Sequence, residues 1–116
     1  MDDMHEISIV RRIIDMAEGE ARQAGSSSIR LIRLKVGVFR GVAVEALEFG
    51  FAVLKKGTLA DGARLEVELV QLRLDCHECG QARTGIGDLS FICPGCGGRM
   101  NLSTGRELEL DYLEID

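Results

Sequence analysis

The fold is decided by two short stretches, Cys76-His77-Glu78-Cys79 and Cys93-Pro94-Gly95-Cys96, which together hold all four cysteines of the chain. Each stretch is a Cys-x-x-Cys pair, and thirteen residues separate the two pairs. Zn²⁺ prefers four ligands at the corners of a tetrahedron, and two such pairs brought together by a hairpin supply four thiolates. The separation is slightly below the ~15–20 residues typical of this pattern. The spacing therefore predicts a structural zinc site formed by Cys76, Cys79, Cys93 and Cys96.

Two other uses of the four cysteines remain open. Tetrahedral sulfur ligands also suit iron, and two disulfides would form if the chain were exported to an oxidising compartment. The start of the chain, Met1-Asp2-Asp3-Met4-His5-Glu6, is acidic where a secretion signal would be basic, and no uninterrupted apolar segment follows it. We therefore expect a cytoplasmic protein, in which a metal site is favoured over disulfides.

Length and composition limit the classes of protein. The 116 residues suffice for one ordinary domain, or for a small domain with a metal-stabilised module. Hydrophobic residues make up 46% of the chain but aromatic residues only 4%, so the core should be aliphatic. The net charge of −5 argues against nucleic acid as a partner, because a binder needs a basic face. No stretch approaches the ~20 apolar residues of a membrane span.

The first part of the chain alternates between helical and strand periodicity. Apolar residues recur at helical spacing from Ile7 to about Ala24, and again from Val42 to Lys55. Between these helices, Ile29–Val38 has the alternation of a strand with one buried face. The residues Val38-Phe39-Arg40, bracketed by two glycines, should form a loop.

The second part predicts two further strands around the cysteine pairs. Arg64–Leu74 alternates strongly and runs directly into the first pair. The last strand passes through Leu108, and its pattern slips near Leu113 and Ile115, which suggests a bulge or a frayed end. Because the cysteine hairpin brings the ends of these two strands together, we expect them to pair with each other.

These elements predict an α+β fold, with two helices on a three-stranded sheet and an inserted four-cysteine module that resembles a zinc ribbon. We expect residues 1–73 and 105–116 to form the α+β domain and residues 74–104 to form the zinc-binding module.

The residues alone favour a binding or accessory protein over an enzyme. Four thiolates leave no open coordination position, so the zinc should fold the module rather than catalyse. His77 reads as a solvated loop histidine, and His5, placed just before the first helix, reads in isolation as an exposed terminal residue. The sequence offers no convincing nucleophile–base pair and no phosphate-binding loop. A zinc-ribbon interaction or scaffold module is the alternative that these residues support, and a metal-dependent enzyme is disfavoured.

A family resemblance adds to this interpretation. The opening Met4-His5-Glu6-Ile7-Ser8-Ile9 resembles the Met-His-Glu-Leu-Ser-Ile opening of the HypA/HybF hydrogenase maturation proteins, which are nickel metallochaperones. The resemblance covers nearly the whole chain from Met4, and the His-Glu opening combined with the two cysteine pairs is specific. Besides those pairs it includes Arg33-Leu34-Lys35-Val36-Gly37, Gly41-Val42, Glu45-Ala46-Leu47, Lys56-Gly57-Thr58, Ala63-Arg64-Leu65-Glu66 and Gly105-Arg106-Glu107-Leu108.

The resemblance implies a function and a second metal site. Such proteins bind one Ni²⁺ at the N-terminus and a structural zinc in the cysteine module. They pass nickel to the large subunit of nickel–iron hydrogenase with the help of the GTPase HypB, and in some bacteria they also serve urease. Carried onto this chain, the imidazole of His5 is a nickel ligand, and backbone nitrogens around His5 and Glu6 complete a nearly planar site. The Glu6 carboxylate would orient that site.

The sequence departs from the family at two places. In the family the motif opens the chain, so the terminal amine can bind nickel, whereas here Met1-Asp2-Asp3 precedes it. Either peptide nitrogens of residues 3–5 replace the amine, or the functional chain starts at Met4. In addition, Val38 stands where the family often has an acidic residue, which removes a polar contact near the nickel end. The oligomeric state is left open between a monomer and a homodimer.

Overall fold

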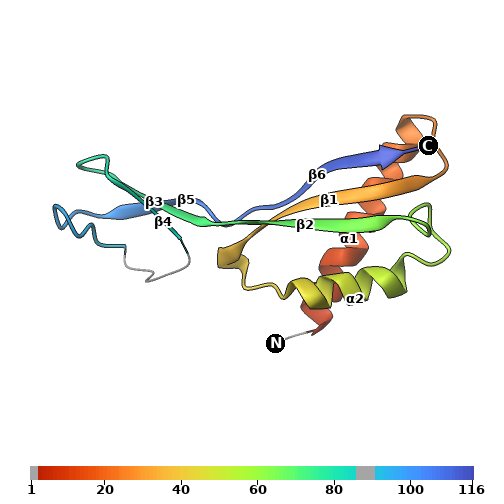
Figure 1. The fold of residues 1–116 in the computed structure, drawn as a ribbon, viewed down its shortest axis with the longest axis horizontal. Helices are drawn as coiled ribbons and strands as arrows, with labels where there is room; N and C mark the ends of the chain where they lie inside the picture. Colours follow the sequence, from red (N-terminus) through yellow and green to blue (C-terminus); the bar gives the residue numbers. More distant parts are fainter. Residues whose placement is uncertain (1–2, 86–90) are drawn as a thin grey trace. The chain divides into compact units, whose positions relative to one another are not determined.

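The computed structural model describes residues 3–85 and 91–116. The described chain forms two helices, six strands and one short 3₁₀ turn, so the expected α+β class is confirmed (Figure 1). In chain order these elements are α1 (Asp3–Gln23), β1 (Ile29–Gly37), η1 (Val38–Arg40), α2 (Val44–Leu54), β2 (Arg64–Val70), β3 (Leu72–Cys76), β4 (Ala82–Gly85), β5 (Met100–Thr104) and β6 (Leu108–Ile115).

The three long strands form one sheet in the order β2-β1-β6. The expected pairing of the last strand with the strand at Arg64–Leu74 is therefore wrong, because β6 and β2 lie on opposite sides of β1. β1 is the most buried of the three strands, and a strand at the centre of a sheet can pair its backbone groups on both sides. The hairpin argument holds only inside the cysteine module, where β3 pairs antiparallel with both β4 and β5.

Three expected boundaries also change. α1 begins at Asp3 rather than Ile7, so the backbone of His5 lies inside the helix. The residues 38–40 form the 3₁₀ turn η1 instead of an irregular loop. The strand expected at 64–74 is interrupted at Gln71, which separates β2 from β3. The last strand continues to Ile115, and its alternation of inward and outward residues shifts between Asp111 and Tyr112.

The chain divides into two compact units. The first comprises residues 1–35, 42–68 and 109–116, and the second comprises residues 36–41 and 69–108. The assignment of a nickel-binding domain to residues 1–73 and 105–116, and of a zinc-binding module to residues 74–104, stays a prediction about function. Within the described residues, no helix is both long and apolar enough to cross a membrane.

The first unit has an aliphatic core between the helices and the sheet. Figure 1 shows α1 and α2 on one side of this sheet, and the two helices pack against each other. Phe51 is the one aromatic side chain among the described core residues, as the composition predicts. The main core side chains are Val10, Ile13, Ile14, Ala17, Ala21, Ile29, Ile32, Leu34, Leu47 and Phe51.

The second unit is held by a small core and by a close approach of two backbone segments. The core contains Leu74, Met100 and two of the cysteines, with Leu102 packed against them. The Gly37 N–H donates to the carbonyl oxygen of Glu107 at 2.7 Å. A Cβ atom at Gly37 would lie 2.0 Å from the carbonyl carbon of Gly105, so a side chain cannot fit there.

Candidate metal-binding sites

The two cysteine pairs form turns of the same design. In the first, the Gly80 N–H donates to the carbonyl oxygen of Cys76 at 3.2 Å, and in the second the Gly97 N–H donates to that of Cys93 at 2.8 Å. Both glycines directly follow the second cysteine of their pair, and their φ angles are +75° and +76°. Side chains rarely adopt this left-handed backbone, so glycine is the residue that lets each turn close. These turns bring both sulfurs of each pair to the same side.

The four sulfurs meet at one point. The Sγ atoms of Cys76 and Cys96 are 3.5 Å apart, those of Cys79 and Cys93 are 3.8 Å apart, and all four lie within 4.8 Å of one another. A tetrahedral zinc ion with sulfurs at 2.3 Å requires sulfur–sulfur distances of about 3.8 Å. The distances greatly exceed the length of a disulfide bond, and all four cysteines are free. The donor set therefore suits a tetrahedral metal ion.

The four thiols differ in exposure and in acidity. Cys76 and Cys93 are buried, whereas Cys79 and Cys96 are exposed. Hydrogen bonds from the backbone N–H groups of Cys79 and Glu78 lower the pKa of Cys76 to about 6. The Gly98 N–H lowers the pKa of Cys96, but the neighbouring thiols of Cys76 and Cys79 together with burial outweigh it and raise the value to about 12. A metal ion must displace a proton from Cys96 in order to bind.

The proposed nickel residues lie in the other compact unit. The backbone of His5 is in the first turn of α1, whereas its imidazole lies outside the described residues. The N–H groups of the N-cap and of the first three helical residues have no acceptor within a helix, so the N–H of His5, the third residue of α1, is free of helical hydrogen bonds, whereas Glu6 is the fourth residue. The structure therefore brings the four cysteines together within the second unit, while the backbones of His5 and Glu6 belong to the first.

Glu6 occupies an unexpected environment. Its residue is only 1% exposed, and its Oε2 accepts a hydrogen bond from the Ala43 N–H at 3.2 Å. Ala43 is the N-cap residue of α2 and has no side-chain oxygen to cap that helix. Glu6 therefore caps α2 from α1, which sequence reasoning missed. A signal did exist, since Glu6 is one helical turn before Val10 and continues the buried stripe of α1.

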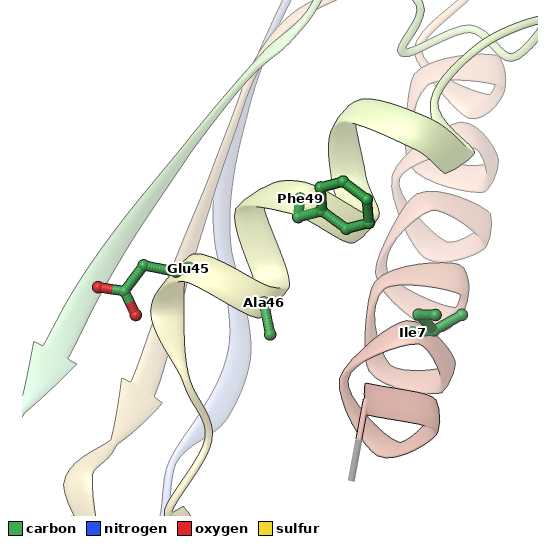
Figure 2. A pocket seen from close by; sticks show the side chains of 4 residues that line it. All are labelled: Ile7, Glu45, Ala46 and Phe49. Carbon is green, nitrogen blue, oxygen red and sulfur yellow. The ribbon is translucent and has the colours of Figure 1, made fainter. Parts of the chain in front are cut away.

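A small apolar pocket lies between the helices near this end of α1. It encloses about 300 Å³ and is lined by Ile7 from α1 and by Glu45, Ala46 and Phe49 from α2. Figure 2 shows Ile7 and Phe49 on the two neighbouring helices, with the Glu45 carboxylate turned away from α1. Phe49 is 71% exposed, so the pocket opens beside a large apolar side chain. Sequence reasoning assigned Phe49 no role.

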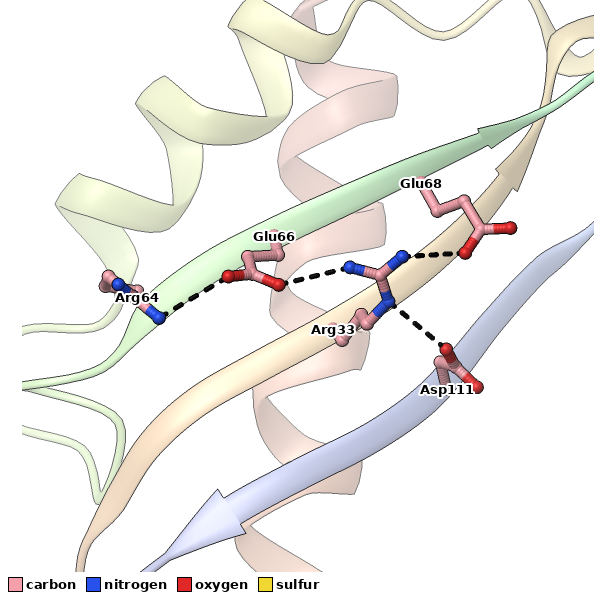
Figure 3. Close-up of polar contacts among 5 residues, drawn as sticks. All are labelled: Arg33, Arg64, Glu66, Glu68 and Asp111. Atoms are coloured by element: carbon pink, nitrogen blue, oxygen red, sulfur yellow. Dashed lines mark hydrogen bonds and ion pairs between the residues drawn. The ribbon is translucent and has the colours of Figure 1, made fainter.

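The outer face of the first sheet carries a cluster of charges. Arg33 of β1 contacts Glu66 at 3.1 Å and Glu68 at 2.7 Å on β2, and Asp111 at 3.4 Å on β6 (Figure 3). Arg64 extends the cluster through Glu66. The hydrogen bond to Glu68 is the main reason that the pKa of Arg33 is raised. One guanidinium thus links the central strand to both neighbours, a structural role that agrees with the observed strand order.

A small α+β fold with a four-cysteine cluster suited to a metal ion defines the class of protein, namely a metal-binding protein. The particular family follows from sequence comparison. The family described as "Hydrogenase/urease nickel incorporation, metallochaperone, hypA" matches residues 4–115. The chain belongs to this HypA family, as the resemblance of its opening and its cysteine pairs predicts.

Relatives and solved structures agree with the family. A hydrogenase maturation factor HypA of Alkalilimnicola ehrlichii is 40% identical, covering 97% of this chain and all of its own length. One of Roseiflexus sp. is 38% identical, covering 97% of this chain and 93% of its own. The solution structure of the nickel metallochaperone HypA from Helicobacter pylori has a TM-score of 0.70 at 20% identity, with 95% of this chain and 96% of that one covered. At this identity the structural likeness supports the fold alone.

Proposed function

We propose that this protein binds Ni²⁺ at its N-terminus and delivers it during maturation of nickel–iron hydrogenase. The observation that carries the proposal is the family match over residues 4–115, which includes His5 and both cysteine pairs. The named relatives are hydrogenase maturation factors. A HypB-type GTPase and the large subunit of the hydrogenase are the partners proposed for the transfer of nickel. Urease is proposed as a second recipient of nickel, and the cytoplasm as the location of the protein.

The proposed nickel ligands are the imidazole of His5 and backbone nitrogens around His5 and Glu6. Nitrogen ligands in a tetragonal plane suit Ni²⁺. The position of His5 as the third residue of α1 supports its part in this set, because its backbone N–H has no acceptor within the helix. A site made mainly of backbone atoms needs a defined backbone, and the helix that begins at Asp3 supports this requirement.

The proposed occupant of the cysteine cluster is one structural Zn²⁺. The supporting observation is the set of four free sulfurs at near-tetrahedral separations, which would complete the coordination of one zinc ion. In this assignment Cys76, Cys79, Cys93 and Cys96 stabilise the second unit and take no part in the transfer of nickel. In this assignment the four cysteines fill every coordination position of the zinc ion, which gives no support to a metal-dependent enzyme.

Calorimetric titration with Ni²⁺ tests the proposal. The zinc-loaded protein should bind one equivalent, and His5→Ala should weaken binding by more than about tenfold, because even the loss of residues that only support ligands costs about 10–100-fold. His77→Ala is the matched control, since His77 is an exposed histidine of the cysteine module. It should leave nickel affinity unchanged.

Two outcomes would contradict the proposal in different ways. Equal nickel affinity in His5→Ala and the unchanged chain would show that His5 is not a nickel ligand. A chain that retains zinc but binds no nickel would favour the alternative function, an interaction or scaffold module with a zinc-ribbon-like site.

A further inference from the structure

We propose that the Glu6 carboxylate is a positioning group that fastens the first turn of α1 to the N-terminus of α2, and that it is not a nickel ligand. The inference rests on the proposed function, because it concerns the same nickel site. It assigns the carboxylate a defined partner, the Ala43 N–H, and makes the start of α2 a part of the nickel-binding apparatus.

The environment of Glu6 supports a structural attachment. The residue is 1% exposed, whereas a metal ion carried for delivery has to be reached from solvent. Its Oε2 already accepts from the Ala43 N–H at 3.2 Å. A carboxylate at a helix N-terminus is stabilised by the helix dipole and by a charge-assisted hydrogen bond. The Oε2 atom is therefore engaged by the start of α2, and the buried side chain is withdrawn from solvent.

The N-terminus of α2 depends on this carboxylate. Helices usually begin with Ser, Thr, Asp or Asn, whose side-chain oxygen accepts one of the unpaired N–H groups. Ala43 holds the N-cap position and has no such oxygen. Glu6 accepts from the N–H of the N-cap residue Ala43 itself, the group that a Glu inside the helix serves in a capping box. One unpaired N–H of α2 and the position of the first turn of α1 therefore share one hydrogen bond.

The attachment consists of a single hydrogen bond within the part of the chain that the structure describes. The other oxygen of Glu6, Oε1, is buried and has no partner among the described residues. Removal of the Ala43 N–H therefore removes this hydrogen bond without changing any residue of α1, and it leaves the buried carboxylate without that partner. The two helices also approach closely nearby, where a Cβ atom added at Gly50 would lie 3.5 Å from Val10 and 3.8 Å from Ile7.

The attachment affects nickel through the backbone. The proposed ligands include backbone nitrogens around His5 and Glu6, and Glu6 is the residue whose side chain is anchored. If the anchor is lost, those nitrogens are no longer held in one arrangement, and the ion must order them when it binds. Coupling between two sites is reciprocal, so nickel should in turn stabilise the start of α2.

Four variants separate a positioning role from a ligand role, with Ni²⁺ as the probe in calorimetric titration of the zinc-loaded protein. Glu6→Gln keeps an acceptor oxygen for Ala43 and should bind nickel within about threefold of the unchanged chain. Glu6→Ala and Ala43→Pro both remove the attachment, and each should weaken nickel binding by about tenfold. Combined in one chain, they should weaken it no more than either alone.

Ala43→Pro is the decisive variant because it touches no proposed ligand. The φ angle of Ala43 is −80° and its ψ is 121°, which proline adopts, so the change removes the N–H without strain at that residue. Val44→Pro is the matched control. It places proline at the first helical position, where it is tolerated, and leaves the N–H of Ala43 in place. It should retain nickel affinity, and circular dichroism should show the four single-substitution variants and the combined variant folded.

Amide hydrogen exchange gives a readout that does not involve nickel. The amides of the first turn of α2 should exchange faster in Glu6→Ala and Ala43→Pro than in Glu6→Gln or Val44→Pro, because the cap is lost in the first two alone. Added nickel should slow exchange at these amides in the unchanged chain.

The outcomes distinguish the two proposals. A loss of nickel binding in Glu6→Gln with full affinity in Ala43→Pro would make the carboxylate a ligand and overturn the positioning role. Full affinity in both Glu6→Ala and Ala43→Pro would overturn it as well. Unchanged affinity in His5→Ala, by contrast, would refute the nickel site itself, whatever the Glu6 variants do.

Discussion

The cysteine cluster and the start of α1 differ in how each could hold a metal ion. The cluster offers four side-chain sulfurs, brought together by two turns of the same design. The proposed nickel site offers one imidazole and several backbone nitrogens, and its geometry depends on where a helix begins. A complete set of side-chain ligands suits permanent retention, whereas a set built largely from backbone suits an ion that is passed on. In the proposed assignment, the ion that stays and the ion that is delivered are therefore held by different kinds of ligand.

The strongest way to break this comparison is to remove a buried sulfur. Cys93 is 1% exposed and belongs to the core of the second unit, so Cys93→Ser should abolish zinc retention and unfold that unit. Structural zinc contributes roughly 10–16 kcal/mol in zinc-finger peptides, far more than a small core supplies. Metal analysis after dialysis and amide exchange within β3 and β5 would measure both effects.

The matched control replaces an exposed serine of β5 that is not a metal ligand, as in Ser103→Ala. It should keep one zinc per chain. An intact second unit in Cys93→Ser after loss of zinc would show that the ion is not structural.

A second test measures how the zinc affinity of the cysteine cluster depends on pH, which probes the thiol ligands that distinguish the cluster from the proposed nickel site. The pKa of Cys96 is raised to about 12 and that of Cys79 is also raised, so both thiols hold protons at pH 7 that zinc must displace. Zinc affinity should therefore fall as pH falls, by about 100-fold or more for each pH unit between 8 and 6. Below the pKa of Cys76, about 6, that thiol takes up a proton too and the fall should steepen. Competition with a chelator of known affinity measures the slope.

A slope close to zero over this range would contradict proton displacement at the cluster. Calorimetry in buffers of different ionisation enthalpy gives an independent count of the protons released.

The smallest expected effect concerns the first three residues. The family match begins at Met4, which places the family's opening motif three residues into this chain. A chain that starts at Met4 should bind nickel more tightly, because the terminal amine can then join His5 as a ligand. Its absorption spectrum should be more typical of planar Ni²⁺. Parallel nickel titrations of the two forms would show the difference. Identical affinities and spectra would mean that peptide nitrogens suffice.

Much of the fold and the gathering of the four cysteines could be predicted from the sequence. The helices and strands follow from the spacing of apolar residues, and the cluster follows from the spacing of the cysteines, because in both cases the signal is local. The neighbour of β6 was predicted wrongly, since strand pairing is set by contacts distant in sequence, such as those of Arg33 with Glu68 and Asp111.

Glu6 illustrates the same limit at the scale of one residue. A charged side chain at the start of a helix reads as solvent-exposed, and only the distant N-terminus of α2 makes its burial favourable. For the same reason the sequence placed His5 before the helix. Glu6 lies on the buried face of α1, but it is charged, so it does not show up in the pattern of apolar residues that marks this helix.

The close approach of Gly37 to Gly105 limits how the protein can be dissected. The compact unit that contains the cysteines is built from residues 36–41 as well as 69–108. A recombinant fragment of residues 69–108 would lose the Gly37 N–H that donates to Glu107, and it would uncover the glycine surface against which Gly37 packs. The metal site therefore cannot be transplanted as one continuous cassette, and a graft onto another scaffold has to supply a substitute for the segment around Gly37.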